Sequence, residues 1–492
     1  MNAKKNRFFR SLNEQGLAVT YDDVRLRTIV AANKRVPSTQ ADVKSRFSRN
    51  VGLKIPIISS PMDTVTTSDM AIAMAMCGGL GIVHAAFDIE QQRAEVRRVK
   101  LHRNGMIKNP VTINQKSSVA AVLQMRADNK YEFSTFPVID DEGALVGIFS
   151  ETDADYCLDK RESVRKHMTP LDKMAFASRK ITSQQAFKLM VDNNKLSHLP
   201  VVDRGGKVTG LYVKSDVLRS INDNPKNYNL DSDGRLMVGA AVPTDPEEAV
   251  ARIKAMVDYI DVVVIDTANG NSRYMYETLK RIKKEFKIDV VAGNVSEGDS
   301  AYQLAKAGAD GIRVGQGGGS ICTTRRETGI GTPQVTAIYE CAKAVKRFNI
   351  PVCADGGIKD KGDIPIALAA GAENVMLGNM LAATKESSGE KVVLENGTVV
   401  VEYRGMGSPS ALRDSAASRK RYGAGTGAPL PEGVETQLLY KGSVHDVIPA
   451  YVKALRKSME YVGAPSIKHL REETELWRIT NAGYRESQPH DI

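Results

Sequence analysis

The sequence lacks most features that mark secreted or membrane-spanning proteins. Five cysteines are present among 492 residues, none forms a CxxC pair, and they stand at Cys77, Cys157, Cys322, Cys341 and Cys353. Such sparse, unpaired cysteines indicate reduced thiols. The chain begins MNAKKNRFFRSLNEQ, without an apolar segment, and contains no apolar run long enough to span a bilayer. We therefore expect a cytoplasmic protein with no membrane partner.

Basic residues are in excess, but they form no continuous stripe. The formal net charge is +10, and Lys and Arg are scattered among Asp and Glu along the chain. A nucleic-acid footprint requires clustered positive charge, so this pattern does not favour nucleic acid as a partner. Hydrophobic residues make up 42% and charged residues 26% of the chain, which is typical of an ordered globular protein. Its length predicts two or more domains.

An internal repeat occupies residues 106–220, with copies at 106–157 and 168–220. Each copy has an apolar helical stretch (AAVLQM, QAFKLM), a strand (FPVID, LPVVD), a turn and a second strand (LVGIFS, VTGLYV). This pattern resembles a tandem pair of CBS domains, a family that often binds adenine or guanine nucleotides. By that resemblance Asp153 and Asp216, which follow the second strands, would contact the ribose of a regulatory nucleotide. The alternative is that each caps a helix.

Outside the repeat, eight short β-branched runs alternate with helical stretches. This alternation predicts an α/β fold, a (β/α)8 TIM barrel made from residues 1–105 and 221–492 and interrupted after its second strand by the repeat. A doubly wound sheet is the alternative, but the glycine fingerprint expected after its first strand is missing. The runs are IPIISSP, GLGIVH, LMVGAAV, DVVVIDT, DVVAGNV, GIRVG, PVCADGG and NVMLG.

The glycine-rich segment GQGGGSICTTRRETGIGTPQ, residues 315–334, follows the sixth expected strand. Barrel enzymes place their chemistry at such strand ends, and glycines let the backbone turn tightly beside a ligand or ion. Arg325 and Arg326 follow Cys322 closely, which favours a thiolate nucleophile. The alternative is a cysteine that only fills space in the core.

GSICTT and TGIGTPQ resemble the active-site loop of the inosine-5′-monophosphate dehydrogenase family. AVTYDDV, SSPMDTV, VAGNV, ADGGI, VMLGNMLA, EYRGMGS, PLPEGVE and YKG extend the resemblance over nearly the whole chain. It implies NAD-dependent oxidation of inosine 5′-monophosphate (IMP) to xanthosine 5′-monophosphate (XMP) in guanine nucleotide biosynthesis. Cys322 would attack the C2 carbon of the hypoxanthine to form a covalent thioimidate, and Thr324 would help to position or activate water. A homotetramer or an octamer is also implied.

The resemblance also implies the ligand sites. Asp355 would hold both ribose hydroxyls, and Asn379 stands where the family commonly has Ser. The phosphate would be bound by Ser320, Gly357, Gly378 and Tyr403. The base edge and pocket would be formed by Met406, Gly407, Glu432, Ser60, Met62 and Asn294. NAD would meet Asp266, Thr267, Ala268 and Arg313. A potassium ion would be held by the carbonyls of Gly317, Gly319 and Cys322, completed by Glu486, Ser487 and Gln488 of a neighbouring subunit.

Residues 406–435 form a long segment rich in Gly, Pro and Ser, which is typical of a lid or a disordered loop. In the dehydrogenases a mobile flap carries an Arg-Tyr pair that enters the vacated dinucleotide site and activates water, and Arg421 and Tyr422 match that pair. GMP reductase, which converts GMP to IMP with NADPH, shares the cysteine loop but lacks the pair. It is the alternative function. A nucleotide-sensing protein with an inactive barrel is the third.

Overall fold

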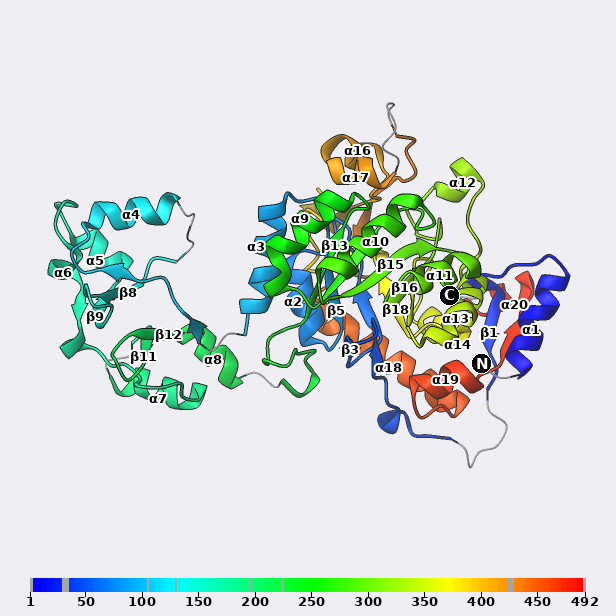
Figure 1. Ribbon diagram of the computed structural model, residues 1–492. Helices are drawn as coiled ribbons and strands as arrows, with labels where there is room; N and C mark the ends of the chain where they lie inside the picture. Colours follow the sequence, from blue (N-terminus) through cyan, green and yellow to red (C-terminus); the bar gives the residue numbers. More distant parts are fainter. Residues whose placement is uncertain are drawn as a thin grey trace. The chain divides into compact units, whose positions relative to one another are not determined.

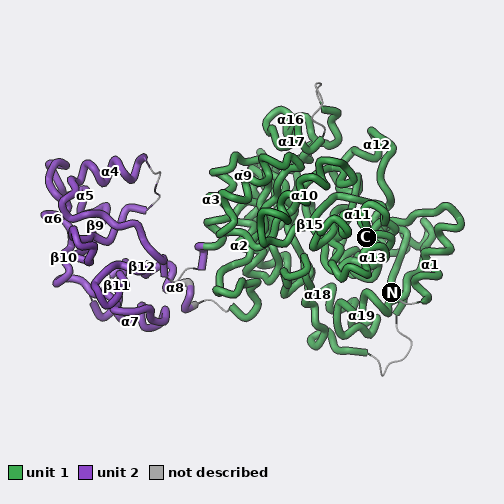
Figure 2. Tube along the Cα trace, viewed as in Figure 1, with its two compact units in different colours: residues 1–100, 225–492 green, residues 101–224 purple. Residues whose placement is uncertain are grey.

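The computed structural model describes residues 3–28, 35–103, 106–128, 131, 133–193, 196–222, 225–422 and 429–489. The chain divides into two compact units (Figure 2). The first comprises Met1–Lys100 and Pro225–Ile492, and the second comprises Leu101–Asn224. The second unit contains the repeat, and its boundaries differ from the expected 106–220 by a few residues on each side.

Eight parallel strands close into a barrel in the first unit (Figure 1). Each apolar run expected to be a strand is one, in the expected order, and β18 closes the barrel by pairing with β4. The (β/α)8 prediction is therefore confirmed. The strands are β4 (Ile57–Ser59), β5 (Leu80–Val83), β13 (Val238–Val242), β14 (Val262–Asp266), β15 (Asp289–Val295), β16 (Gly311–Val314), β17 (Val352–Asp355) and β18 (Asn374–Leu377).

Alternate residues of these strands face opposite ways, because side chains in a strand alternate between its two sides. One set, including Ile82, Val264 and Met376, packs with Phe47 in a cluster of its own. The other set belongs to the larger core with the surrounding helices. Phe47 comes from the hairpin of β2 (Ser45–Arg46) and β3 (Gly52–Leu53). The barrel is therefore filled by side chains, as expected for this fold.

The surrounding helices bury one face each against the strands. In α10 (Arg273–Glu285), for example, Met275, Leu279 and Ile282 are buried at helical spacing while the remaining positions are mostly basic or acidic. The other main helices are α2 (Ser68–Met76), α3 (Ile89–Leu101), α9 (Pro246–Met256), α11 (Gly298–Lys306), α13 (Gln334–Val345), α14 (Asp363–Ala370), α18 (Val444–Val462) and α19 (Ile467–Glu473).

A small antiparallel sheet next to the barrel carries the expected flap. It consists of β19 (Lys391–Val393), β20 (Val399–Arg404) and β21 (Glu435–Leu439). The flap is the connection between β20 and β21, and its described part forms α16 (Pro409–Asp414) and α17 (Ala416–Arg421). Because β20 and β21 pair directly, both ends of the flap are anchored at one place.

The remaining elements of the first unit lie at its ends and between the strands. β1 (Val24–Leu26) pairs with β22 (Leu476–Arg478), which brings the two ends of the chain together. The other helices here are α1 (Ala3–Glu14), α12 (Thr324–Thr328), α15 (Asn379–Ala382) and α20 (Asn481–Glu486). No helix in the described parts of the chain is long and apolar enough to cross a membrane.

The second unit contains the two copies of the repeat, each with a sheet and helices. The first copy has β7 (Ile113–Asn114), α4 (Val119–Asp128), β8 (Phe136–Ile139), β9 (Leu145–Phe149) and α5 (Glu151–Tyr156), followed by α6 (Val164–His167). The second has α7 (Ser183–Asp192), β11 (His198–Val202), β12 (Val208–Val213) and α8 (Lys214–Asn222). These helices and strands fall where the repeated sequence pattern predicts them.

The two copies exchange their leading strands. β6 (Ile107–Lys108) lies at the start of the first copy but pairs with β12 of the second copy. β10 (Thr169–Pro170) lies at the start of the second copy but pairs with β9 of the first. The turns of the copies also meet, through a bridge between Ala144 and Lys207. Each sheet is therefore completed by a strand from the other copy.

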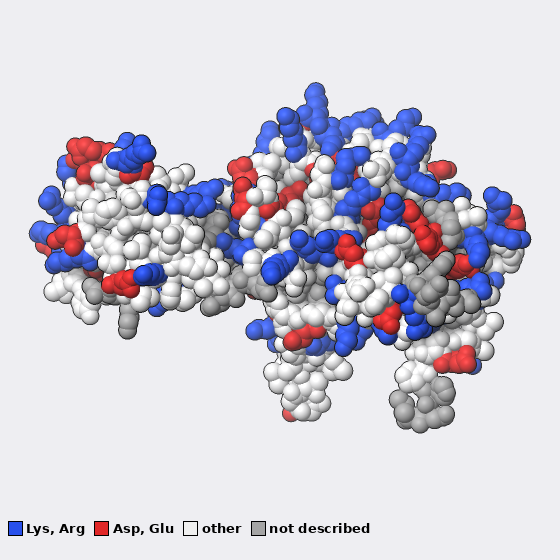
Figure 3. Space-filling view, turned by 90° about the horizontal axis from the view of Figure 1, so that it is seen from below, with Lys and Arg blue, Asp and Glu red and all other residues white. Residues whose placement is uncertain are grey.

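Charged side chains of both signs are mixed on the surface. On the face shown in Figure 3, Lys and Arg lie among Asp and Glu in both units. Many of them form exposed ion pairs, such as Arg273 with Glu277 and Lys166 with Glu162. A mixed surface of this kind agrees with the scattered charge of the sequence.

Candidate functional site

A cavity lies at the carboxyl ends of the barrel strands and has about 750 Å³ of empty space, including its open mouth. Its walls come from the ends of β4, β14, β15, β16 and β17, from the loop after β16 and from both sides of the flap. Fifteen residues expected to act in the site line this cavity: Ser60, Met62, Ala268, Asn294, Arg313, Gly317, Gly319, Cys322, Thr324, Asp355, Tyr403, Met406, Arg421, Tyr422 and Glu432.

Cys322 begins a short chain of polar contacts. Its Sγ lies 3.1 Å from Oγ1 of Thr324, and that hydroxyl donates to Oε2 of Glu432 at 2.6 Å. A hydroxyl carries a single proton. Since Thr324 gives its proton to Glu432, the Cys322 thiol must donate to Thr324, and the three groups form a relay from sulfur to carboxylate.

The backbone holds this relay in place. Cys322 forms an antiparallel bridge with Gly433, and the Thr323 N–H donates to the carbonyl of Glu432 at 3.0 Å. Thr324 begins α12, so its position is also fixed by a helix. The segment between the flap and β21, at Glu432 and Gly433, is therefore hydrogen-bonded to the cysteine loop.

A second network lies across the barrel mouth and is centred on Arg313, which is 2% exposed. Its Nε donates to Oδ2 of Asp355 at 2.9 Å, and its Nη1 forms an ion pair with Asp266. The Nδ2 of Asn294 donates to the same Asp355 oxygen at 2.7 Å. Two carboxylates around one buried guanidinium satisfy its charge, so Asp266 and Asp355 are held rigidly.

The flap reaches this network through Arg421, which forms an ion pair with Asp266. Its guanidinium carbon also lies 5.7 Å from the centre of the Tyr422 ring. Burial raises the pKa of Tyr422, and the charge of Arg421 opposes that rise. The tyrosine packs against Gly407, where a Cβ atom would stand 2.8 Å from Cζ of the ring. The described end of α17 therefore lies in the cavity, directly beside the cysteine relay.

Tyr403, Met62, Gly378 and Ser320 meet at one side of the cavity. The Tyr403 hydroxyl donates to Sδ of Met62 at 3.8 Å, and a Cβ at Gly378 would lie 3.1 Å from each of those two atoms. Burial raises the pKa of Tyr403, and a hydrogen bond with Ser320 opposes that rise. Asn379 begins α15 directly after Gly378. Four residues expected to bind phosphate or line the pocket are therefore in contact.

The loop between β16 and α12 needs glycine for its shape. Gly315 has φ of +146°, and a Cβ there would come within 1.9 Å of the Asp355 carbonyl oxygen. Gly317 has φ of +69° and packs against Arg325. Arg325, expected to activate the thiol, donates to the carbonyls of Gln316 and Thr332. Its observed contacts therefore stabilise the loop.

Sequence reasoning missed Gln334, which holds two strand ends together. Its Nε2 donates to the carbonyls of Val314 and Asp355, at 2.9 and 3.0 Å. The residue is 1% exposed and begins α13. It belongs to the TGIGTPQ motif, so the signal was present, but no contact could be assigned to it from the sequence.

Several expected site residues lie outside this cavity. Asp266 lines a neighbouring hollow with Met406 and Arg421, and Thr267 is buried beside it, bonded through its backbone to Gly293 and Asn294. Gly357, with φ of +80°, packs on the Tyr21 ring. Glu486, Ser487 and Gln488 are exposed at the end of α20, and they do not line the cavity in this chain.

Asp153 and Asp216 lie in the second unit, in the first turns of α5 and α8. Oδ2 of Asp153 accepts hydrogen bonds from the backbone N–H and hydroxyl of Ser150, at 2.7 and 2.8 Å. This is a capping box, the alternative considered for this residue. The two aspartates occupy equivalent places in the two copies.

Two buried polar atoms of the cavity lack a hydrogen-bond partner within the described structure. They are Oδ1 of Asn294 and Nε of Arg421. Buried polar groups are nearly always paired in folded proteins, so such atoms in a cavity wall point to a polar ligand. The cavity thus combines a thiol, a chain of hydrogen bonds from that thiol to a carboxylate, the ion-paired carboxylate of Asp355 and two polar atoms without a partner in the described structure.

Comparison with known proteins agrees with this arrangement. The family model described as "IMP dehydrogenase / GMP reductase domain" matches residues 18–490. The chain belongs to the IMP dehydrogenase / GMP reductase family. The resemblance found in the sequence is therefore confirmed for the family as a whole.

Curated relatives in this family include two inosine-5′-monophosphate dehydrogenases similar over their length. That of Aquifex aeolicus is 43% identical over 479 residues, which covers 96% of this chain and 95% of the relative. That of Rhodopirellula baltica is 42% identical and covers 97% of this chain and 87% of the relative. Among solved structures, GMP reductase of Trypanosoma brucei with bound guanosine 5′-monophosphate has a TM-score of 0.81 and 35% identity, covering 98% of this chain and all of that chain.

Proposed function

We propose that this chain catalyses the NAD-dependent oxidation of IMP to XMP in guanine nucleotide biosynthesis. The observation that carries the proposal is the relay from Cys322 through Thr324 to Glu432, with Arg421 and Tyr422 of the flap in the same cavity. The names of the curated relatives support the same reaction. A thiol beside a proton acceptor is what covalent catalysis on a purine ring requires.

In the first half of the reaction, Cys322 adds to C2 of the hypoxanthine. The thiol proton passes to Thr324, whose own proton passes to Glu432, so that the negative charge of the carboxylate is transferred to the sulfur that attacks C2. NAD, when bound, accepts the hydride from C2. Loss of that hydride leaves the purine attached to Cys322 as a thioimidate.

In the second half, water attacks C2 and releases XMP from Cys322. Arg421 of the flap lines the cavity and is ion-paired with Asp266, and an arginine normally keeps its proton. We therefore assign it to orienting and polarising the water together with Tyr422. Glu432 first releases the thiol proton to solvent. Through Thr324 it then accepts a proton from the attacking water and returns that proton to the sulfur of Cys322 as the C2–S bond breaks.

The substrate would be held by the fixed groups of the barrel. Both observed contacts to Asp355 use its Oδ2, so we assign Oδ1 to the ribose hydroxyls. The unpaired Oδ1 of Asn294 offers a further acceptor nearby. The phosphate would lie at the Tyr403 cluster, near the loops after β17 and β18, where barrels commonly bind phosphate. Its proposed ligands are Ser320, Gly357, Gly378, Asn379 and Tyr403, and the base would face Ser60, Met62, Met406, Gly407 and Glu432.

The residues expected to hold NAD suit a polar ligand. Arg421 lies against the carboxylate of Asp266, and its Nε has no hydrogen-bond partner in the described structure. We assign Asp266, Thr267, Ala268 and Arg313 to that ligand. Because Arg421 now pairs with Asp266, the flap and the dinucleotide would use this neighbourhood in turn.

We propose that the cysteine loop holds a potassium ion through backbone carbonyl oxygens, which can replace the hydration shell of this ion. We assign Gly317, Gly319 and Cys322 to it. The carbonyl of Gly319 already accepts the Cys322 N–H at 3.1 Å, so an ion there would also stabilise the nucleophile's backbone. Glu486, Ser487 and Gln488 would come from a neighbouring subunit of a tetramer, or of an octamer.

GMP reductase is the second candidate, favoured by the close structural match to the Trypanosoma brucei enzyme. A decisive assay mixes the purified protein with IMP and NAD and follows NADH absorbance, in parallel with GMP and NADPH. We expect NADH formation with IMP and no NADPH oxidation with GMP. The opposite pair of results would assign the reductase reaction, and inactivity in both assays would favour the nucleotide sensor.

For the second unit we propose that the tandem CBS pair binds an adenine or guanine nucleotide through Asp153 and Asp216. The two carboxylates stand in the first turns of the corresponding helices α5 and α8. Each copy could therefore bind the ribose of a nucleotide through its own aspartate. ATP or GTP should raise the melting temperature of the protein, and Asp153→Ala with Asp216→Ala should remove that rise. An unchanged melting temperature with either nucleotide would contradict the proposal.

A further inference from the structure

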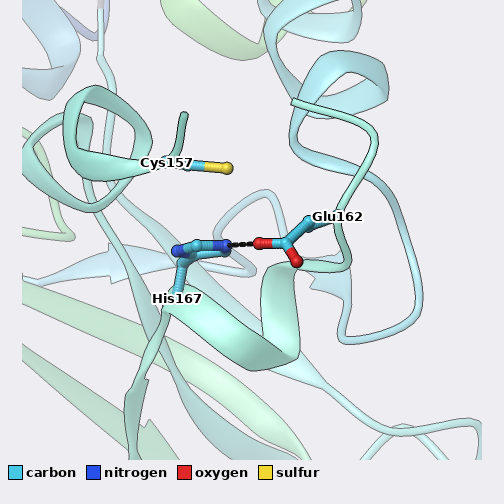
Figure 4. Close-up of side chains that lie close together, drawn as sticks. All are labelled: Cys157, Glu162 and His167. Carbon is cyan, nitrogen blue, oxygen red and sulfur yellow. Dashed lines mark hydrogen bonds and ion pairs between the residues drawn. The ribbon is translucent and has the colours of Figure 1, made fainter. Parts of the chain in front are cut away.

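The segment that joins the two copies of the repeat brings together three side chains of different chemistry. Cys157 directly follows α5 as its C-cap. Glu162 lies in the turn before α6, and His167 is the last residue of α6. One ligand atom from each lies within 4.8 Å of the other two. Figure 4 shows the three side chains extending toward a common space. We propose that this cluster binds a zinc ion.

The spacing between the ligand atoms suits a tetrahedral ion. With Zn–S near 2.3 Å and Zn–N or Zn–O near 2.1 Å, bound ligand atoms stand about 3.4 to 3.6 Å apart. Nε2 of His167 and Oε2 of Glu162 are now 2.7 Å apart, joined by a hydrogen bond. Zinc would take the place of the shared proton, so this pair opens slightly while the sulfur moves inward. The required shifts are no larger than about 1 Å, within the reach of side-chain rotation.

The donor types select the metal. A thiolate, an imidazole and a carboxylate together are the ligand set of zinc, whereas calcium and magnesium require oxygen ligands alone. Cys157 is 1% exposed, while Glu162 and His167 are partly open to solvent. The buried side of the ion would thus be covered by sulfur, and the open side leaves room for water as the fourth ligand.

The neighbouring charges are compatible with a bound cation. Lys166 pairs with Oε1 of Glu162 at 2.7 Å, which leaves Oε2 free to act as a single-atom ligand. The ammonium group of Lys160 is hydrogen-bonded to the carbonyls of Ala154 and Cys157 and not to Glu162. Among the described residues, the Cys157 thiol donates to the Asp159 carbonyl, at 3.1 Å. Binding therefore breaks that hydrogen bond and releases the thiol proton to solvent, so a thiolate and a carboxylate balance the charge of Zn²⁺.

The ion would fasten the connecting segment to the first copy. The backbone of this segment already bonds to the start of α4 and the residues before it: the Val119 N–H donates to the carbonyl of Glu162 and the Val164 N–H to that of Ser117. β10, the strand given to the first copy's sheet, begins two residues after His167. Zinc would thus fix the end of α5, the whole of α6 and the start of β10 as one piece.

Cobalt titration of the full-length protein tests this site, because a cobalt–thiolate bond has a strong charge-transfer band. The reduced protein, freed of metal with a chelator, is titrated with Co²⁺ and then with Zn²⁺. We expect one Co²⁺ per chain, the thiolate band, and its loss as Zn²⁺ displaces the cobalt. Cys157→Ser should abolish the band, and His167→Gln should weaken binding by roughly 100-fold. Glu142→Gln, an exposed carboxylate of the same copy, is the matched control and should leave binding unchanged.

Two further measurements keep the result decisive. Circular dichroism and NADH formation, measured with potassium but without added Co²⁺ or Zn²⁺, should be the same in Cys157→Ser, His167→Gln and the parent protein, so that lost binding is not lost folding. His167 is on the surface side of the cluster, so His167→Gln still tests the site if Cys157→Ser does not fold. No thiolate band in the parent, a band that survives in Cys157→Ser, a Co²⁺ affinity unchanged in His167→Gln, or a band lost in Cys322→Ser would overturn the proposal.

Discussion

Arg421 of the flap is ion-paired with Asp266 at the end of β14. Asp266 also binds Arg313, which in turn holds Asp355. One carboxylate therefore connects the flap to the group proposed to hold the substrate ribose. The flap must break the ion pair between Arg421 and Asp266 to leave the cavity. The position of the flap therefore depends on what is bound at the ligand site.

Arg421→Ala should slow hydrolysis more than hydride transfer, because only the second step uses the flap. We expect a normal burst of NADH in stopped-flow measurements, followed by a steady-state rate lower by about 100-fold, as misplacement of a reacting group commonly costs. Arg413→Ala, which removes an exposed arginine of α16, is the matched control and should change neither phase. An unchanged steady-state rate in Arg421→Ala would contradict the assigned role.

Cys322→Ala should abolish XMP formation while IMP still binds, because the substrate contacts come from other residues. Isothermal titration with IMP and an NADH assay measure the two properties separately. Cys77→Ala is a suitable control, since burial raises the pKa of that thiol to about 12 and keeps it unreactive at neutral pH. Full activity in Cys322→Ala would exclude it as the nucleophile.

Thr324→Val should interrupt the relay while nearly preserving the side-chain volume. The Cys322 thiol would lose its acceptor and Glu432 its donor, so both thiolate formation and water activation would suffer. We expect kcat to fall by roughly 100-fold and thiol alkylation by iodoacetamide to become slower at neutral pH. Thr328→Val, at the end of the same helix, should retain the parent rates. Unchanged alkylation in Thr324→Val would show that the hydroxyl does not assist the thiol.

His84 should make the protein less stable in acid. Burial lowers the pKa of His84 from 6.5 to about 4, so between these values the unfolded chain binds a proton that the folded protein does not. Stability is therefore lost as pH falls from 6.5 to 4, by about 3 kcal/mol. His84→Gln should shrink this loss, measured as the change in melting temperature between pH 7 and 5. His469→Gln, at an exposed position, should keep the parent's pH dependence, and equal slopes for all three proteins would contradict the assignment.

Gly315→Ala should destabilise the barrel mouth severely. Its φ is strained for any other residue, and the new Cβ would overlap the Asp355 carbonyl oxygen. We expect a loss of more than about 4 kcal/mol, or failure to fold. Gly16→Ala, where φ is +65° but no atom lies within 4 Å, should cost only about 1 kcal/mol. Comparable melting temperatures for the two variants would show that Asp355 can shift.

Much of the barrel could be predicted because its strands are buried on both sides. In DVVVIDT, for example, the four residues Val262 to Ile265 are consecutive and apolar, and the number and spacing of such runs leave few alternative folds. The site followed from this, since strand ends meet at one face of a barrel. Asp266 and Asp355 stand far apart in the chain; the family resemblance assigned both to the site, and both stand at the end of a barrel strand.

Contacts made by short or isolated elements could not be predicted. β6 and β10 have two residues each, too few for any periodic pattern, so the strand exchange gave no signal. The bridge between Cys322 and Gly433 depends on how the flap returns. The contact of Cys157 with Glu162 and His167 could not be predicted. The separations of these residues along the chain match neither the period of a helix nor that of a strand. Such contacts are set by tertiary structure alone.

The exchange of β6 and β10 limits how the second unit can evolve and be engineered. A copy removed by itself would take away a strand from the sheet that remains and leave an unpaired edge, which invites aggregation. The pair must therefore be gained or lost as a whole. A gene lacking residues 101–224 should yield a well-behaved barrel, whereas deletion of either half of that region should not.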